Sequence, residues 1–138
     1  MRDQAGGCLC GAVRFVLKAE PQAVVICHCT HCRKQSGSAF SVNLLMREGD
    51  VEVSGETRFF VDHGDSGLPS HRHFCPNCGS PLMTRAENLP GVAIVKAGAL
   101  DDPAAVRPQA EIYTDHALGW FTPVAGAARY EQAPPPAR

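Results

Sequence analysis

The stretch F-C-P-N-C-G-S-P-L, residues 74–82, carries the pattern on which the fold depends. Cys75 and Cys78 have a zinc-knuckle spacing, in which a tight turn brings both thiolates onto one metal ion. Gly79 follows the second cysteine and permits the positive φ that such a turn often needs. The alternative is a thioredoxin-like redox pair, but that motif begins a helix, and residues 79–85 have no helical pattern. The stretch therefore predicts half of a tetrahedral metal site.

Cys8 and Cys10, in the sequence C-L-C, predict the other half of this site. Side chains two residues apart in an extended segment point to the same face, so both thiolates can reach one ion. Four thiolates fill the coordination sphere of zinc and leave no position for a substrate. We therefore expect a structural zinc that links the first strand to a late one, held by Cys8, Cys10, Cys75 and Cys78.

The stretch C-H-C-T-H-C, residues 27–32, supplies three more cysteines. Three protein ligands with an open fourth position are typical of catalytic zinc. Three thiolates weaken the Lewis acidity of the ion toward water and favour a soft fourth ligand such as a thiol. We predict that this second zinc binds a thiol substrate and that its protein ligands are Cys27, Cys29 and Cys32.

The histidines of this stretch leave a structural alternative open. His28 or His31 would close the site if either were the fourth ligand. In an extended segment His28 points away from the neighbouring cysteines, which favours the open site. A third interpretation treats the cysteines as redox thiols without a stable metal. Arg33 and Lys34 follow directly and are expected to offset excess negative charge or to hold a carboxylate of an incoming ligand.

The composition limits the class of protein. The 138 residues include seven cysteines, an odd number in three tight groups. Residues 1–7 contain no apolar stretch of the length that an export signal requires, so we expect metal ligands rather than a disulfide framework. Thirteen basic and fourteen acidic residues leave no positive field for nucleic acid. The longest apolar runs, 23–27 and 91–95, are too short to span a membrane. We expect a cytoplasmic protein with one domain over residues 1–131 and a disordered tail over 132–138.

Alternation of apolar and polar residues predicts a mainly β fold. Strands are expected at 13–18, 24–27, 40–46, 51–53, 58–61, 71–74, 92–97 and 111–114. Asp102 and Pro103 form a helix-start signal, and the helix that they begin is expected to have one or two turns at most. The helix content should therefore be low.

The order of these motifs resembles the glutathione-dependent formaldehyde-activating enzyme family, called Gfa-like, to which centromere protein V is related. The resemblance rests on GGCLCGAVRF (6–15), CHCTHCRKQSGSAF (27–40), FCPNCGSPL (74–82), AGALDDP (97–103) and HALGWF (116–121). It implies a single-domain zinc-binding β-tent fold with two zinc ions. It assigns the structural ion to Cys8, Cys10, Cys75 and Cys78, and the catalytic ion to Cys27, Cys29 and Cys32.

The resemblance also implies an activity of the carbon–sulfur lyase type, in which a glutathione-like thiol and a formaldehyde-like aldehyde are joined or cleaved at the three-cysteine zinc. The family's named reaction forms S-(hydroxymethyl)glutathione. Small-molecule thiols and aldehydes are then the expected partners, with no nucleic acid and no membrane. The alternative is a non-catalytic zinc-stabilised β module that binds a protein partner. A homo-oligomer and incomplete zinc occupancy of the three-cysteine site are left open.

Overall fold

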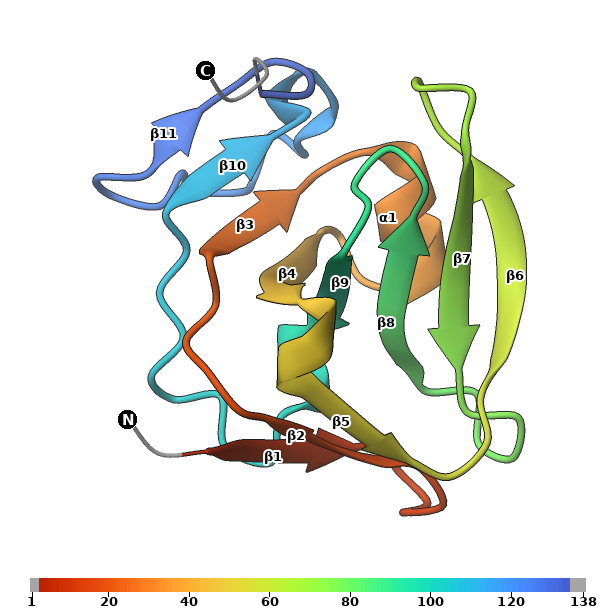
Figure 1. Cartoon of the computed structure of the whole chain (residues 1–138). Helices are drawn as coiled ribbons and strands as arrows, with labels where there is room; N and C mark the ends of the chain where they lie inside the picture. Colours follow the sequence, from red (N-terminus) through yellow and green to blue (C-terminus); the bar gives the residue numbers. More distant parts are fainter. Residues whose placement is uncertain (1–2, 135–138) are drawn as a thin grey trace.

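Two β-sheets contain most of the regular secondary structure of the protein (Figure 1). The computed structural model describes residues 3–134. The smaller sheet has the order β1 (Gln4–Gly7), β2 (Arg14–Leu17) and β5 (Val51–Ser54). The larger sheet has the order β11 (Ala128–Arg129), β10 (Ala110–Ile112), β3 (Ala23–Cys27), β4 (Ser41–Arg47), β9 (Val92–Lys96), β8 (Pro81–Ala86), β7 (Pro69–Phe74) and β6 (Arg58–His63). The prediction of a mainly β fold is confirmed.

Helical structure is sparse among residues 3–134. It comprises one α-helix, α1 (Thr30–Ser36), and three short 3₁₀ turns, η1 (Glu48–Asp50), η2 (Ala97–Ala99) and η3 (Thr114–His116). The turn expected after Asp102 is a single one, closed by the N–H of Val106 donating to the carbonyl of Pro103. No helix in the described part of the chain is long and apolar enough to cross a membrane. The predicted tail, 132–138, lies partly outside the described residues, and within them the carbonyl of Gln132 accepts from the N–H of Tyr113.

All eight predicted strands are present, with ends shifted by a few residues, and the stretch 27–32 passes from a strand into a helix. Cys27 ends β3, and Cys29 caps the N-terminus of α1 with its Sγ accepting from the N–H of Cys32 at 3.3 Å. The helix ends at Gly37, whose φ of 68° is accessible to glycine at little cost. The six-residue cysteine motif therefore spans a strand-to-helix junction.

The larger sheet directs apolar side chains toward the core, and polar side chains occupy part of its other face. On β4, Leu44 and Met46 belong to the hydrophobic core, which also includes Phe15 and Leu17 of the smaller sheet. The core therefore lies between the two sheets. Successive strand residues face opposite sides, so Asn43 of β4 faces away from the core.

The register extends this polar face across the sheet. Three cross-strand pairs lie on this face: Cys27 with Ser41, Asn43 with Lys96, and Arg72 with Thr84. Asp62 lies on the same face, because it is two residues along β6 from Phe60, which pairs with Arg72. We call this set the polar row: Cys27, Ser41, Asn43, Lys96, Thr84, Arg72 and Asp62. Helix α1 lies over its Arg72 end, where His31 contacts Asp62 and Cys32 contacts Arg72. The polar row and α1 together form the floor and wall of the sites described below.

Replacing Leu44 by Ala should lower the free energy of unfolding by about 2–5 kcal/mol, because its side chain is only 1% exposed and the substitution leaves a cavity. Urea denaturation measures this change. Leu68→Ala, at an exposed loop position, is the control and should change stability by less than about 0.5 kcal/mol. Equal losses in the two variants would contradict the placement of the core between the sheets.

Candidate metal centres

The first cluster brings together the four cysteines expected to form a structural site. The Sγ atoms of Cys8, Cys10, Cys75 and Cys78 all lie within 4.8 Å of one another. The Sγ of Cys10 is 3.6 Å from that of Cys8 and 3.7 Å from that of Cys75. Thiolates about 2.3 Å from a tetrahedral zinc stand about 3.8 Å apart, so the donor set and its spacing fit zinc.

Local backbone structure prepares these sulfurs for a negative charge. The N–H groups of Val13 and Cys78 point at the sulfurs of Cys8 and Cys75, at 3.2 and 3.5 Å. Hydrogen bonds from the side chain and main chain of Ser80 lower the pKa of Cys78 to about 5. A thiol with a lowered pKa is a ready metal ligand because the thiolate is the coordinating form. Gly79 has the positive φ predicted for it, 79°.

The cluster joins the two sheets. Cys8 and Cys10 lie in the connection from β1 to β2, in the smaller sheet, whereas Cys75 and Cys78 lie in the connection from β7 to β8, in the larger one. The 64 residues between the two pairs, 11–74, are thereby closed into a loop. A metal at this point would contribute directly to folding, since the unfolded chain has no preformed site.

The second cluster consists of Cys27, Cys29 and Cys32, whose Sγ atoms also lie within 4.8 Å of one another. Cys27 comes from the end of β3, Cys29 from the cap of α1 and Cys32 from its first turn. Among residues 3–134, no histidine or carboxylate joins these three sulfurs as a further converging ligand atom. Three thiolates suit zinc, and such a set leaves the fourth position of a tetrahedron to another molecule.

His28 faces away from this cluster, as the alternation predicts. Its Nε2 lies 2.9 Å from Oε1 of Glu111, and the two side chains are 1% and 0% exposed. Oε2 of Glu111 accepts from the N–H of Val124 at 2.8 Å, and Oε1 also accepts from Arg129 at 3.0 Å. The His28 ring packs edge-on against Phe121, with centroids 4.7 Å apart. His28 therefore fixes the C-terminal segment to β3 and β10.

His31 is engaged with a carboxylate from another strand. Its Nδ1 lies 2.8 Å from Oδ2 of Asp62, and the same carboxylate accepts from Nε of Arg72 at 2.9 Å. Burial alone would raise the pKa of Asp62, but the hydrogen bonds from His31 and Arg72 outweigh it and lower that pKa. Asp62 is thus ionised at neutral pH and holds both side chains at the cluster.

Two buried cations act on the three-cysteine cluster. Nη2 of Arg72 lies 4.0 Å from Sγ of Cys32, and Nζ of Lys96 donates to Ser41 Oγ at 2.7 Å and Asn43 Oδ1 at 3.3 Å. Hydrogen bonds from the Cys27 and Cys29 thiols lower the pKa of Cys32, and the charges of Lys96 and Arg72 lower it further. The sequence predicts charge compensation by Arg33 and Lys34. It does not identify Arg72 and Lys96, because only strand pairing brings these two residues to the motif.

A cleft of about 320 Å³ opens onto the three cysteines. Its other walls come from the loop between β6 and β7 and from Arg72, Asn88 and Tyr113. Tyr113 has a φ of 54°, which is unusual for a residue with a side chain, and its hydroxyl donates to Asp65 at 2.8 Å. Burial and the neighbouring Asp65 raise the pKa of Tyr113, so its hydroxyl stays protonated. Strained backbone of this kind is frequent at functional clefts.

The structure thus defines a mainly β protein with two cysteine clusters suited to metal, one closed and one beside a cleft. Residues 3–116 match the family described as glutathione-dependent formaldehyde-activating enzyme, and the chain belongs to this family. A crystal structure of a Rhodobacter sphaeroides protein shares the fold, with a TM-score of 0.56 and 19% sequence identity. The match covers 91% of this chain and 98% of that protein.

Loss of the four-cysteine cluster should lower the stability of the protein more than loss of the three-cysteine cluster. The purified chain should carry two zinc ions by elemental analysis, and both Cys75→Ser and Cys29→Ser should lose one. Cys75→Ser should also lower Tm strongly, because its metal links the sheets, whereas Cys29→Ser should lower it far less. Similar losses of Tm in the two variants would contradict the division into a structural and a non-structural cluster.

Glu111→Ala should lower the free energy of unfolding by about 3–5 kcal/mol at neutral pH, since His28 and Arg129 lose a buried partner. Burial alone would raise the pKa of Glu111, but the N–H of Val124 and the side chains of His28 and Arg129 outweigh it and lower it. A lowered pKa in the folded state means that this stability is present above pH about 4.5 and is lost as the pH falls below it. Chemical denaturation between pH 7 and pH 3 measures both effects.

The control for this experiment is Glu56→Gln, at an exposed position of the chain. It should leave the pH dependence as in the wild type, whereas Glu111→Gln should flatten it below pH about 4.5. A wild-type slope in Glu111→Gln would show that Glu111 does not carry the acid sensitivity.

Proposed function

We propose that the protein joins a thiol to a small aldehyde, and reverses that reaction, at Cys27, Cys29 and Cys32. The observation that carries this proposal is the open three-thiolate cluster beside a cleft, with both nearby histidines engaged elsewhere. The family description supports glutathione as the thiol and formaldehyde as the aldehyde. The reaction class is then that of a carbon–sulfur lyase working in the direction of synthesis.

Zinc held by the three cysteines would bind the substrate sulfur and favour its thiolate form. Arg72 and Lys96 of the polar row place two positive charges beside this sulfur-rich centre. Arg72 lines the cleft, and its guanidinium is the cation best placed to stabilise negative charge that develops on the aldehyde oxygen.

His31 is the group that we assign to proton transfer. Asp62 accepts the Nδ1–H of His31, which leaves Nε2 free to take the thiol proton. The sulfur electron pair then forms the carbon–sulfur bond, and the carbonyl π electrons move to oxygen. The oxygen receives the proton back from His31, so a hydroxymethyl thioether forms with no atom gained or lost.

The proposal also covers the cellular location and the domain organisation of the enzyme. Its seven cysteines are all free thiols, and a reducing compartment such as the cytoplasm keeps them available as metal ligands. We place the catalytic unit in a single domain over residues 1–131, because β11 and the chain after it contact β10 and η3.

A second candidate function, a non-catalytic zinc module, is favoured by the outer edge of the larger sheet. Strand β6 is the last strand of its sheet, and Phe59, Phe60 and Val61 are 51%, 63% and 42% exposed. An exposed apolar edge strand is a surface that proteins commonly cover with a partner. The two functions differ in whether the cleft at the three cysteines turns over a substrate.

Cys29→Ser should abolish the acceleration of thiol–aldehyde exchange, measured by magnetisation-transfer NMR with glutathione and formaldehyde above the spontaneous rate. His31→Ala should reduce the acceleration about 10²-fold or more while two zinc ions are retained, since only the proton transfer is lost. Glu56→Gln is the matched control and should behave as the wild type. Acceleration that persists in Cys29→Ser after loss of one zinc would refute the proposal and favour the binding module.

A further inference from the structure

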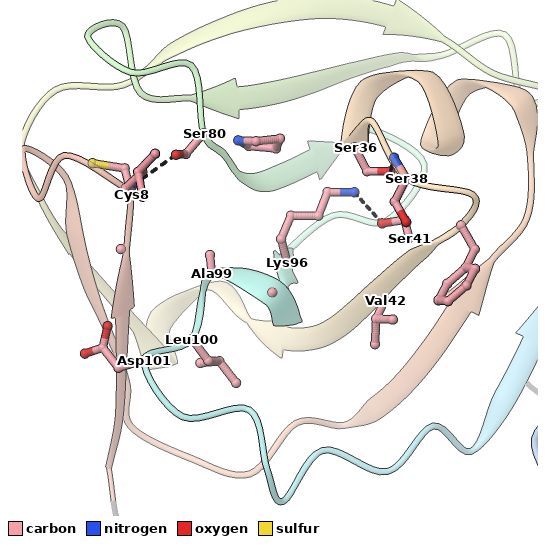
Figure 2. A pocket seen from close by; sticks show the side chains of 15 residues that line it. Cys8, Ser36, Ser38, Ser41, Val42, Ser80, Lys96, Ala99, Leu100 and Asp101 are labelled. Carbon is pink, nitrogen blue, oxygen red and sulfur yellow. Dashed lines mark hydrogen bonds between the residues drawn. The ribbon is translucent and has the colours of Figure 1, made fainter.

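A second cleft, of about 480 Å³, lies between the Cys8–Leu9 turn, the C-terminal end of α1 and η2 (Figure 2). None of the three cysteines of the open cluster lines it. Lys96, Ser36, Ser38 and Ser41 lie at one end, and Phe40, Val42, Pro81 and Leu100 supply apolar wall. A cavity of this size with a few polar groups at one end has the form of a small-molecule site.

Lys96 is the charged group of this cleft, and it is only 7% exposed. Figure 2 shows its side chain extending along the cleft to the hydrogen bond with Ser41. Its two hydrogen-bond partners, Ser41 and Asn43, are both neutral, and residues 3–134 provide no carboxylate within ion-pair distance of Nζ. An ammonium has three N–H donors, so one remains for a ligand. The thiolates of the open cluster can balance the charge of Lys96. The unused N–H is therefore the group that an anion in the cleft would engage.

The other polar groups of the cleft agree with a single negative charge. Ser36 Oγ is occupied, since it donates to the carbonyl of Arg33 and accepts from the N–H of Ser38. Asp101, at the rim, is neutralised by a two-pronged ion pair with Arg14. One ammonium with one unused donor suits a monoanion, whereas a phosphate dianion would require several more donors.

We propose that this cleft binds a small aliphatic monocarboxylate. The carboxylate accepts the free N–H of Lys96, and the hydrocarbon chain lies along Phe40, Val42 and Leu100. The ligand needs neither a thiol nor an aldehyde, so this site is additional to the thiol–aldehyde reaction and does not depend on it.

Calorimetric titration of the zinc-loaded chain with acetate, butyrate and hexanoate tests the site. Affinity should rise about fourfold for each added methylene, since each buried methylene contributes about 0.8 kcal/mol. Hexanamide, which has the same chain without the charge, should bind at least tenfold more weakly than hexanoate. In ¹⁵N NMR spectra, hexanoate should shift the amides of Ser38, Gly98 and Ala99 rather than those of Gly64 and Asp65.

Two variants keep the proposal falsifiable. Lys96→Gln should weaken hexanoate binding at least tenfold by removing the charge. Gly98→Leu should also weaken it at least tenfold, because a Cβ at Gly98 meets no atom within 4 Å and a leucine there would extend into open space at the cleft. Lys34→Gln is the matched control, because Lys34 is an exposed lysine of α1 that lines a different groove. The Lys34→Gln variant should bind hexanoate with the affinity of the wild type.

Three results would overturn the proposal. The first is that hexanamide binds as tightly as hexanoate. The second is that none of the carboxylates binds at millimolar concentration. The third is that Gly98→Leu retains the wild-type affinity for hexanoate. Because none of the probes carries a thiol, failure here leaves the thiol–aldehyde proposal unaffected, and failure of that proposal leaves this one intact.

Discussion

The convergence of Cys8 and Cys10 with Cys75 and Cys78 is the constraint on which the rest of the structure depends. It joins the connection between β1 and β2 to the connection between β7 and β8, and so fixes the smaller sheet against the larger one. The core lies between these sheets, and its burial fixes which face of the larger sheet is apolar. Once that face is assigned, strand alternation leaves the opposite face for polar side chains. The polar row is therefore a consequence of where the cysteine cluster joins the sheets.

Burying Lys96 and Arg72 in that row is costly unless negative charge accompanies them. The three thiols of the open cluster supply it. Three thiolates on a divalent ion leave one net negative charge, which Lys96 can balance, while Arg72 is paired with Asp62. With a divalent ion bound, the charges of this arrangement would be close to balanced. The negative charge of the sulfur cluster thus offsets the cost of burying the two cations, and the cations in turn stabilise the thiolates.

The sequence predicted the parts of this structure that depend on local spacing. The C-x-x-C and C-x-C motifs predicted both cysteine clusters, and the position of Gly79 after a cysteine predicted its positive φ. The alternation of apolar and polar residues predicted eight of the strands. It missed β1, whose last residues are Gly6 and Gly7, and β8, which begins with a proline, because neither has a β-rich composition. It also missed β11, which has only two residues. It also missed α1, because this seven-residue helix has no apolar repeat at helical spacing. The roles of Arg72, Lys96 and Glu111 depend on strand register between distant segments, which local patterns do not specify.

The strand-to-helix junction at Cys27 to Cys32 shows how one short segment serves two purposes. Cys27 and Cys29 face the cleft, and the intervening His28 faces the other way, into the buried contact with Glu111 and Phe121. The carboxylate of Glu111 in turn accepts hydrogen bonds from the N–H of Val124 and the side chain of Arg129. Movement of the C-terminal segment would therefore displace His28 and, through the backbone, the two cysteines that flank it. The geometry of the open cluster therefore depends on contacts with Phe121, Val124 and Arg129, which lie beyond residue 116, where the family match ends.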